Sequence, residues 1–460
     1  MLLDEQMMEL GKNIVHDLMR DFCLLKAQEE NFLKAVLMGE DSATASSMLS
    51  SSTTIRRLGV YYVGGSKRKG YVKPLRIHEK WNLQHVRSCQ FYFFSNTLKD
   101  SDWRRMKSIF KGFKLVTFMD LGKAQFPGYK QKTLPKAIGN LIHLRYLSIR
   151  DSKIYGLPSS IGNLRLLETL DLRIEYEVEL VIPNVLRKLV QLRHLYLPGR
   201  IKGRYSPFKV KLQLDGLGKL ETLERFDADT CDVSSISKLT NLRKVVIYVY
   251  PTKHLDVILE SFNLSGSDSL LRHSSVRFSG DSDSWGTPEE QKHLVRQVLG
   301  YHHIHKLVLF GTSLTELPDT SPPNLTHLRL EATRLEEDPM PKLKKFPKLR
   351  TLTLGGREWK GLVCSADQSG FPQLIHLKLS WCEHLEEWRV EQGAMPNLLH
   401  LEIVECPRLK EIPDGLRFVK TLRKLSFIGP QRLCDRLEKG GEDFDKIQHV
   451  QSITIHSSKF

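Results

Sequence analysis

The chain has 460 residues, of which 40% are hydrophobic and 27% are charged, and its formal net charge is +16. This composition supports a large buried core, and no stretch approaches the roughly 18 consecutive apolar residues of a membrane-spanning helix. Seven cysteines are scattered without a disulfide-like pattern and no apolar leader follows Met1, so we expect a reducing, cytoplasmic compartment, with nuclear or peripheral membrane pools left open.

The first 40 residues predict a short helical segment. Leu18, Phe22 and Leu25 recur at helical spacing between His16 and Leu33. A Ser-rich stretch of low complexity follows over residues 41–54, which is typical of a linker. A piece of about 40 residues is too small to fold well alone, so we expect it to be part of something larger. The chain therefore divides into three predicted parts, residues 1–40, 41–54 and 55–460.

Residues 55–460 repeat one pattern. The segment Leu134–Ile149 returns 23 residues later as Leu157–Leu172, with Leu-Pro, Ile-Gly-Asn-Leu and Leu-x-x-Leu-x-apolar in the same order. A period of about 20–29 residues is typical of leucine-rich repeats. The first apolar position of each unit falls at Ile55, Val86, Val116, Leu144, Leu167, Leu192, Leu223, Leu242, Ile304, Leu325, Leu349, Leu374, Leu398, Leu422 and Val450.

These repeats predict an α/β fold, a horseshoe-shaped solenoid of about 16 irregular repeats with a parallel sheet on its concave face. One coil cannot bury its own leucines, so the core arises by stacking. The gap of 62 residues between Leu242 and Ile304 predicts a degenerate repeat near Val276 to Phe278. Residues 199–211 and 251–300 break the frame and are expected to form loops or insertions.

A solenoid presents a surface rather than a pocket, so solvent-facing strand positions are the candidates for binding protein partners. Exposed apolar residues such as Ile375 and Leu399 cost solubility without helping the core, which indicates a contact surface. The alternative is tolerated scatter or cover by a neighbouring loop. The candidates in the late repeats are Arg350, Thr351, Thr353, Ile375, His376, Lys378, Leu399, His400, Glu402, Arg423, Lys424 and Ser426.

The sequence predicts neither catalysis nor a metal site. No Ser-His-Asp, paired-carboxylate or Cys-x-x-Cys constellation stands out. His376 and His400 occupy equivalent positions of neighbouring repeats, but a metal would need further ligands with fixed support, and Lys424 on the next repeat repels a cation. Cys382 and Cys406 each follow a predicted strand and are expected to be small apolar fillers.

Positive charge is concentrated in residues 56–153, which hold 22 Lys and Arg against five Asp and Glu. A field of this strength attracts acidic partners. No nucleic-acid-binding module and no repeated aromatic and basic platform accompanies it. We therefore expect an acidic protein surface rather than nucleic acid as the partner, with a merely soluble basic surface as the alternative.

Four motifs carry a family resemblance. They are the Leu-Pro and Ile-Gly-Asn-Leu pattern of residues 134–172, Val15-His16-Asp17, the stretch from Glu386 to Pro413, and the closing stretch from Gly441 to Val450. Together they resemble the coiled-coil class of plant nucleotide-binding leucine-rich-repeat disease-resistance proteins. Val15-His16-Asp17 is similar to the Met-His-Asp motif of that class, with valine in place of methionine. The resemblance runs from about residue 12 to the end of the chain.

The resemblance implies that residues 1–40 are the helical remnant of a winged-helix subdomain. It implies that the repeats sense pathogen effectors or guarded host proteins, after which such receptors exchange ADP for ATP, oligomerise and trigger defence. His16, with Val15 and Asp17, would match the nucleotide-sensing histidine. The first repeats would dock on the acidic nucleotide-binding module, and the candidates for this docking are Arg56, Arg57, Arg104, Arg105, Lys107 and Lys111.

The chain departs from the family pattern at the phosphate site. It contains no Gly-x-x-x-x-Gly-Lys-Ser/Thr, and Gly64–Gly70 lacks both the spacing and the hydroxyl after the lysine. We therefore expect no cofactor in this chain, and ADP or ATP to bind only where a nucleotide-binding module is present. His16 is then expected to be the vestige of a nucleotide-sensing site. Two hypotheses follow: the repeats restrain that module within a receptor, or a free-standing truncated repeat protein acts as an adaptor or decoy.

Overall fold

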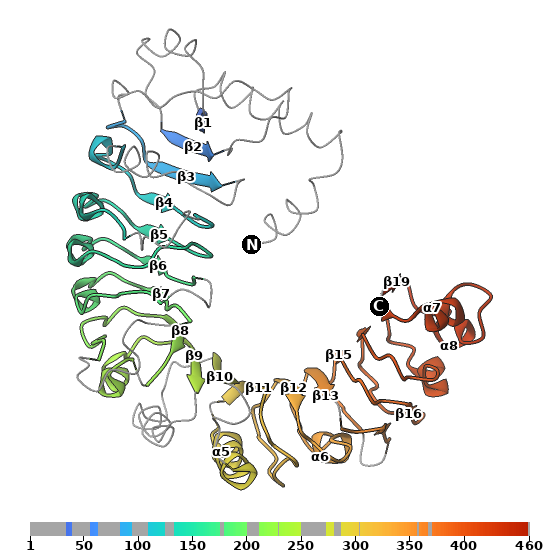
Figure 1. Ribbon diagram of the computed structural model, residues 1–460. Helices are drawn as coiled ribbons and strands as arrows, with labels where there is room; N and C mark the ends of the chain where they lie inside the picture. Colours follow the sequence, from blue (N-terminus) through green and yellow to red (C-terminus); the bar gives the residue numbers. More distant parts are fainter. Residues whose placement is uncertain are drawn as a thin grey trace. The chain divides into compact units, whose positions relative to one another are not determined.

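The computed structural model describes residues 34–38, 56–62, 83–93, 109–124, 133–174, 179–199, 211–228, 230–249, 273–279, 287–302, 304–356, 358–366 and 370–458. The chain divides into two compact units, residues 1–223 with 229–241, and residues 224–228 with 242–460 (Figure 1). The helix expected over 16–33, the linker expected over 41–54 and the motif at Val15-His16-Asp17 lie outside the described residues.

The first unit stacks short parallel strands, one per coil. Each strand pairs with the next one along the chain, from β1 through to β7. β1 follows the expected helix but lies within residues 1–40, which the resemblance assigns to a winged-helix remnant; it pairs with β2 and so belongs to the sheet. The strands are β1 (Lys34–Met38), β2 (Arg57–Tyr62), β3 (Ser88–Phe93), β4 (Phe118–Asp120), β5 (Tyr146–Ser148), β6 (Thr169–Asp171) and β7 (His194–Tyr196).

Proline precedes two short 3-10 helices, in the motifs Leu134-Pro135 and Leu157-Pro158, because it fits the first position before a helix and fixes its backbone. Other short 3-10 helices of the first unit begin without a Leu-Pro motif, and all of them lie between strands in the chain. The 3-10 helices are η2 (Lys136–Asn140), η3 (Ser159–Asn163), η4 (Leu186–Lys188) and η5 (Val233–Lys238). The glycine of the Ile-Gly-Asn-Leu motif has a packing role. A Cβ on Gly139 would overlap the carbonyl oxygen of Ser160 in the next coil and lie 2.6 Å from its Cβ. Only glycine lets these coils approach so closely.

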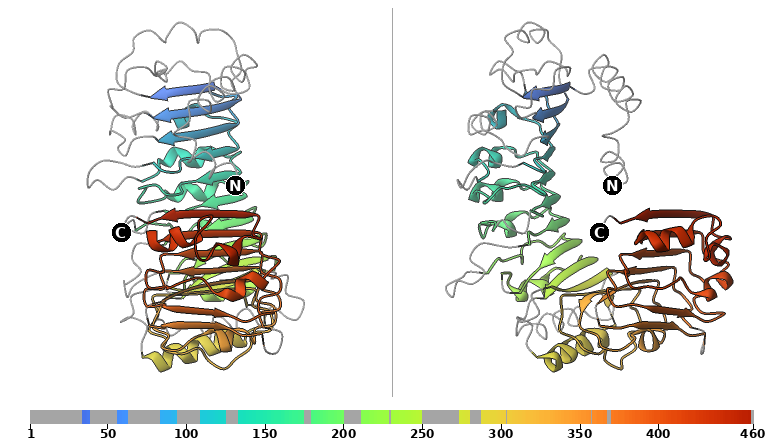
Figure 2. Two further views of the ribbon diagram at one scale, coloured as in Figure 1. Left: turned by 90° about the vertical axis from the view of Figure 1, so that its right-hand side faces the viewer. Right: turned by 45° about the vertical axis from the view of Figure 1, so that its right-hand side comes forward.

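The second unit continues the same parallel pairing. Strands β9 to β13, then β15, β17, β18 and β19, pair in that order, while β14 and β16 pair separately. Figure 2 shows the strands stacked within each unit. The strands are β9 (Lys244–Val249), β10 (His273–Ser279), β11 (Ile304–Phe310), β12 (His327–Thr333), β13 (Thr351–Gly356), β14 (Gly361–Cys364), β15 (His376–Ser380), β16 (Glu387–Val390), β17 (His400–Val404), β18 (Lys424–Gly429) and β19 (Ser452–Ser457).

Helices of the second unit lie between these strands in the chain. They are α5 (Pro288–Gly300), α6 (Met340–Leu343), η8 (Asp414–Phe418), α7 (Gln431–Leu437) and α8 (Phe444–Ile447). α5 begins with a capping box in which the Thr287 side chain and the Glu290 side chain each accept a backbone N–H of the other residue. Within the described residues, no helix combines the length and apolarity that crossing a bilayer requires.

The core is a ladder of repeated apolar positions. In the coil of β15, Leu374, Leu377 and Leu379 are all fully buried, while the residues between them are partly exposed. Burying one such side chain stabilises the fold by roughly 1.5–3 kcal/mol, so the ladder is the main source of stability. The predicted leucine-rich-repeat solenoid is confirmed at this level.

Two expectations about the repeat frame need correction. Strand β8 (Thr222–Phe226) shows that Leu220, not Leu223, is the first apolar position of its coil, because Thr222 N–H donates to the Arg193 carbonyl as the equivalent residues do. Arg225 has a left-handed backbone (φ 63°), an extra residue that delays the third apolar residue to Phe226. The frame break over 251–300 contains β10 and α5. β10 pairs with both β9 and β11, so the degenerate repeat predicted near Val276 to Phe278 is confirmed.

Candidate interaction surface

In the late repeats, two consecutive residues at the start of the strand lie outside the core, and their N–H groups donate to the same carbonyl oxygen of the preceding coil. The N–H groups of Ile375 and His376 both donate to the Arg350 carbonyl, at 2.8 and 3.0 Å. Ile375 directly precedes β15 and His376 begins it, and both side chains are half-buried. The same two hydrogen bonds recur for Leu399 and His400 on the Ile375 carbonyl, and for Arg423 and Lys424 on the Leu399 carbonyl.

We call the side of β13, β15, β17 and β18 that faces away from the core the open sheet face. None of the twelve candidate residues predicted from the late repeats is buried. Exposed are Arg350, His400, Arg423 and Lys424, and half-buried are Thr351, Thr353, Ile375, His376, Lys378, Leu399, Glu402 and Ser426. The structure thus brings these residues together on neighbouring strands, while their role in binding stays a prediction.

Pairing in register arranges the open sheet face in rows. His376 is paired with His400, and His400 with Lys424, across β15, β17 and β18. The next outward row pairs Lys378 with Glu402 on the adjacent strand. Glu402 therefore lies between two basic side chains of β15: its carboxylate oxygens are 3.2 Å from His376 Nε2 and 3.1 Å from Lys378 Nζ.

This grouping shifts the protonation of both partners. Burial lowers the pKa of His376, and the charges of His400 and Lys378 lower it further, although Glu402 acts in the opposite direction. For Glu402, burial alone would raise the pKa, but the hydrogen bond and charge of Lys378, with the charge of His376, hold it below its ordinary value. At neutral pH the face therefore carries a neutral His376 beside an ionised Glu402.

Two substitutions should move the pKa of His376 in opposite directions. We expect Glu402→Gln to lower it, because the neighbouring negative charge is lost, and Lys378→Met to raise it, because a repelling charge is lost. Titration of the imidazole resonances by NMR measures both shifts in the folded chain. A shift of the same sign in both variants would show that direct charge interactions do not govern this cluster.

The histidine pair and the cysteine pair have the positions that the sequence predicts. The rings of His376 and His400 have centroids 6.0 Å apart. Among the described residues, no group of three or more His, Cys, Asp and Glu could hold a metal ion. Cys382 and Cys406 are buried, and the hydrogen bond between their side chains, together with burial, holds the pKa of Cys382 above its ordinary value. A thiol whose pKa is raised stays protonated and unreactive, which agrees with a structural role for Cys382 as a small apolar filler.

The basic candidates of the early repeats are only partly described. Arg56 and Arg57 precede and begin β2 and are exposed, and Lys111 is exposed after the buried Ile109 and Phe110. Arg104, Arg105 and Lys107 lie outside the described residues. Docking through this region therefore stays a prediction.

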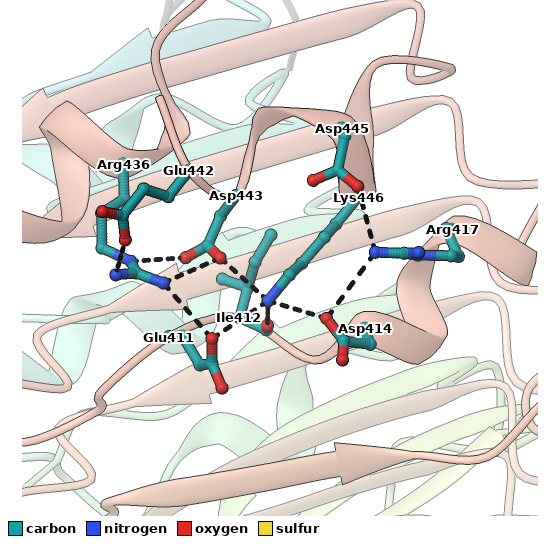
Figure 3. Close-up of polar contacts among 9 residues, drawn as sticks. All are labelled: Glu411, Ile412, Asp414, Arg417, Arg436, Glu442, Asp443, Asp445 and Lys446. Atoms are coloured by element: carbon teal, nitrogen blue, oxygen red, sulfur yellow. Dashed lines mark hydrogen bonds and ion pairs between the residues drawn. The ribbon is translucent and has the colours of Figure 1, made fainter. Parts of the chain in front are cut away.

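A group of charged residues near the end of the chain has no counterpart in the sequence predictions (Figure 3). We call Glu411, Asp414, Arg436, Asp443 and Lys446 the closing cluster. The Lys446 ammonium group lies 2.8 Å from Asp443, 2.9 Å from Asp414 and 3.2 Å from Glu411, and donates to the Ile412 carbonyl at 2.9 Å. Arg436 binds the same Asp443 carboxylate through Nε and Nη2, at 2.8 and 3.0 Å.

The closing cluster ties α7 and α8 to the preceding coil. The side chains of Asp443 and Lys446 are 1% and 6% exposed, so these charges are stable only because they are paired. Lys446 lies in the closing stretch that carries the family resemblance, but its partners Glu411 and Asp414 are 35 and 32 residues earlier in the chain. The sequence offered one signal, the opposite charges of Asp443 and Lys446 three positions apart.

The comparisons with known proteins agree with this architecture. A family model described as a leucine-rich repeat region matches residues 85–440. The chain belongs to the leucine-rich repeat family. Over 95% of its length it is 33% identical to disease resistance protein RPP8 of Arabidopsis thaliana, and over 96% it is 36% identical to the probable disease resistance protein RXW24L of the same plant. The predicted relationship to plant disease-resistance proteins is thereby confirmed.

These leucine-rich-repeat relatives are longer proteins: the chain spans 45% of the length of both. Among solved structures, the chain is similar to one from the Drosophila Toll–Spatzle complex, with a TM-score of 0.47 and 13% identity, covering 92% of this chain and 54% of that one. A leucine-rich-repeat protein of Leptospira interrogans matches with a TM-score of 0.40 and 16% identity, covering 82% of this chain and 86% of that one.

Proposed function

We propose that this chain is the repeat-bearing part of a plant immune receptor and that the open sheet face of its second unit binds a protein partner, a pathogen effector or a guarded host protein. The observation that carries the proposal is the collection of twelve exposed or half-buried side chains on neighbouring strands. Polar, basic and apolar side chains share this sheet face, which suits a protein partner better than a small substrate. The similarity to plant disease-resistance proteins supports a role in immunity for this surface.

The first unit has a second part in this proposal. Arg56, Arg57 and Lys111 are exposed in a region rich in Lys and Arg, and opposite charge favours an acidic nucleotide-binding module as its partner. Within a receptor this contact restrains the module, and ADP or ATP binds there rather than on the repeats. If the chain acts alone as an adaptor or decoy, the same region binds the module of another molecule. The compartment in either case is the cytoplasm.

Exchanging strands between natural variants tests the recognition part of the proposal. Transfer of residues 374–428 from one allele into another should transfer the effector specificity, because the segment contains the open-face residues of β15, β17 and β18. The readout is the defence response of leaves that express each chimera with each effector. Transfer of residues 140–194 is the control, since it replaces an equal length of the first unit. Specificity that follows the control segment would contradict recognition by the open sheet face.

A further inference from the structure

Four residues, each immediately before a strand, form a continuous row along one edge of the open sheet face. They are Arg350, Ile375, Leu399 and Arg423, and we call them the edge row. Backbone hydrogen bonds join them in this order. The N–H of Ile375 donates to the Arg350 carbonyl at 2.8 Å, that of Leu399 to the Ile375 carbonyl at 2.9 Å, and that of Arg423 to the Leu399 carbonyl at 2.9 Å. The order of side chains along the row is therefore fixed by the sheet itself.

The edge row combines an apolar centre with positive ends. Ile375 and Leu399 are half-buried, although neither contributes to the leucine ladder of the core. Arg350 and Arg423 are exposed, and no carboxylate within the described part of the chain lies within ion-pair distance of either guanidinium group. Elsewhere on this face Glu402 already neutralises Lys378. The guanidinium groups of these two arginines are thus the charges of the row that can form ion pairs with a partner.

The spacing of the row fits an extended peptide. Neighbouring strands lie about 4.8 Å apart, so the three steps from Arg350 to Arg423 span roughly 14 Å. An extended chain advances about 3.4 Å per residue and alternates its side chains, so residues i and i+4 lie on one side roughly 14 Å apart. Residue i+2 lies on the same side, midway between them, which is the position opposite Ile375 and Leu399.

We propose that the edge row binds an extended acidic protein segment of the form acidic-x-apolar-x-acidic, crossing the strands with its carboxylates on Arg350 and Arg423 and its apolar side chain on Ile375 and Leu399. Arginine suits this role because its planar guanidinium group forms paired hydrogen bonds with a carboxylate. The apolar contact orders the segment and excludes water from its centre. This inference rests on the proposed function and specifies the chemistry of the partner.

Fluorescence anisotropy with the purified full-length chain tests the inference. The probe is a labelled peptide, Gly-Ser-Glu-Thr-Leu-Thr-Glu-Ser-Gly, and the matched control has the same composition with adjacent carboxylates, Gly-Ser-Glu-Glu-Leu-Thr-Thr-Ser-Gly. We expect the first peptide to bind at least tenfold more tightly than the control. Arg350→Glu and Arg423→Glu should each weaken binding of the first peptide at least tenfold, because like charges then face one another.

Arg408→Glu is the matched control variant, since Arg408 is exposed on the turn after β17 and carries the same change of charge away from the row. It should leave binding within about twofold, and circular dichroism should show that all three variants are folded. The inference is overturned if both peptides bind equally, if neither binds at about 1 mM, or if a single-stranded oligonucleotide competes through the same two arginines.

The outcomes also separate this inference from the proposed function. If the peptide binds as expected but the exchange of residues 374–428 leaves effector specificity unchanged, the chemistry of the edge row stands and the proposed recognition fails. If the exchange moves specificity but the two peptides do not differ, recognition uses other residues of the open sheet face and the inference fails.

Discussion

Replacing Gly415 with alanine is expected to destabilise the second unit by about 3 kcal/mol, the upper end of the usual cost of overpacking. Gly415 lies in η8, which packs against β16 so closely that an added Cβ would overlap the Val390 carbonyl oxygen and lie 2.6 Å from its carbonyl carbon. A backbone carbonyl cannot rotate away, so either η8 or β16 must shift. Urea denaturation followed by circular dichroism measures the loss of stability.

Gly300→Ala is the matched control for this substitution. Gly300 is the last residue of α5, and a Cβ there meets no atom within 4 Å. Alanine favours helix over glycine by up to about 1 kcal/mol, so this variant should be as stable as the parent or slightly more stable. A Gly415→Ala chain that unfolds at the same urea concentration as the parent would show that η8 and β16 are not in close contact.

Asp443→Asn is expected to destabilise the chain by about 3 kcal/mol at neutral pH, because it removes the charge that Arg436 and Lys446 share. Asparagine has the same shape, so the effect comes from charge rather than from packing. The Asp443 side chain is 1% exposed, and Lys446 would be left with a weaker set of partners in a buried position. Asp445→Asn is the control: this carboxylate is 56% exposed and pairs only with the partly exposed Arg417, so its loss should cost less than about 1 kcal/mol.

Asp443 also makes part of the free energy of unfolding depend on pH. Burial alone would raise the pKa of Asp443, but hydrogen bonds from Arg436 and Lys446 hold it below its ordinary value. A carboxyl group whose pKa is lower in the folded state stabilises above its unfolded pKa, about 3.9 for aspartate, and this stabilisation disappears as pH falls through the folded pKa. The stability difference between the parent and Asp443→Asn should therefore shrink below about pH 4. A difference that stays constant across this range would show that Asp443 is not held ionised by the closing cluster.

The closing cluster and the edge row show what the repeat frame leaves open. Asp443 and Lys446 belong to the last turns of the chain, while Glu411 and Asp414 belong to the coil before them, and the loops between these coils set their distance. The period of the apolar residues does not predict such contacts between charged side chains. In the same way, Leu220 and Leu223 are both apolar, so the sequence allows either to start the repeat, and the Thr222 hydrogen bond and the left-handed Arg225 show that Leu220 does.

The solenoid, the register of most coils and the residues of the open sheet face all follow from the order of apolar and polar residues along the chain. This was possible because burial repeats: apolar residues equivalent to Leu374, Leu377 and Leu379 recur in most coils, and each inward residue fixes which neighbours face solvent. The contacts between different coils, such as Glu402 with His376, Gly415 with Val390, and Lys446 with Asp414, became apparent only once the coils were stacked. Those contacts depend on strand pairing and loop length, and these are properties of stacked coils rather than of any single repeat.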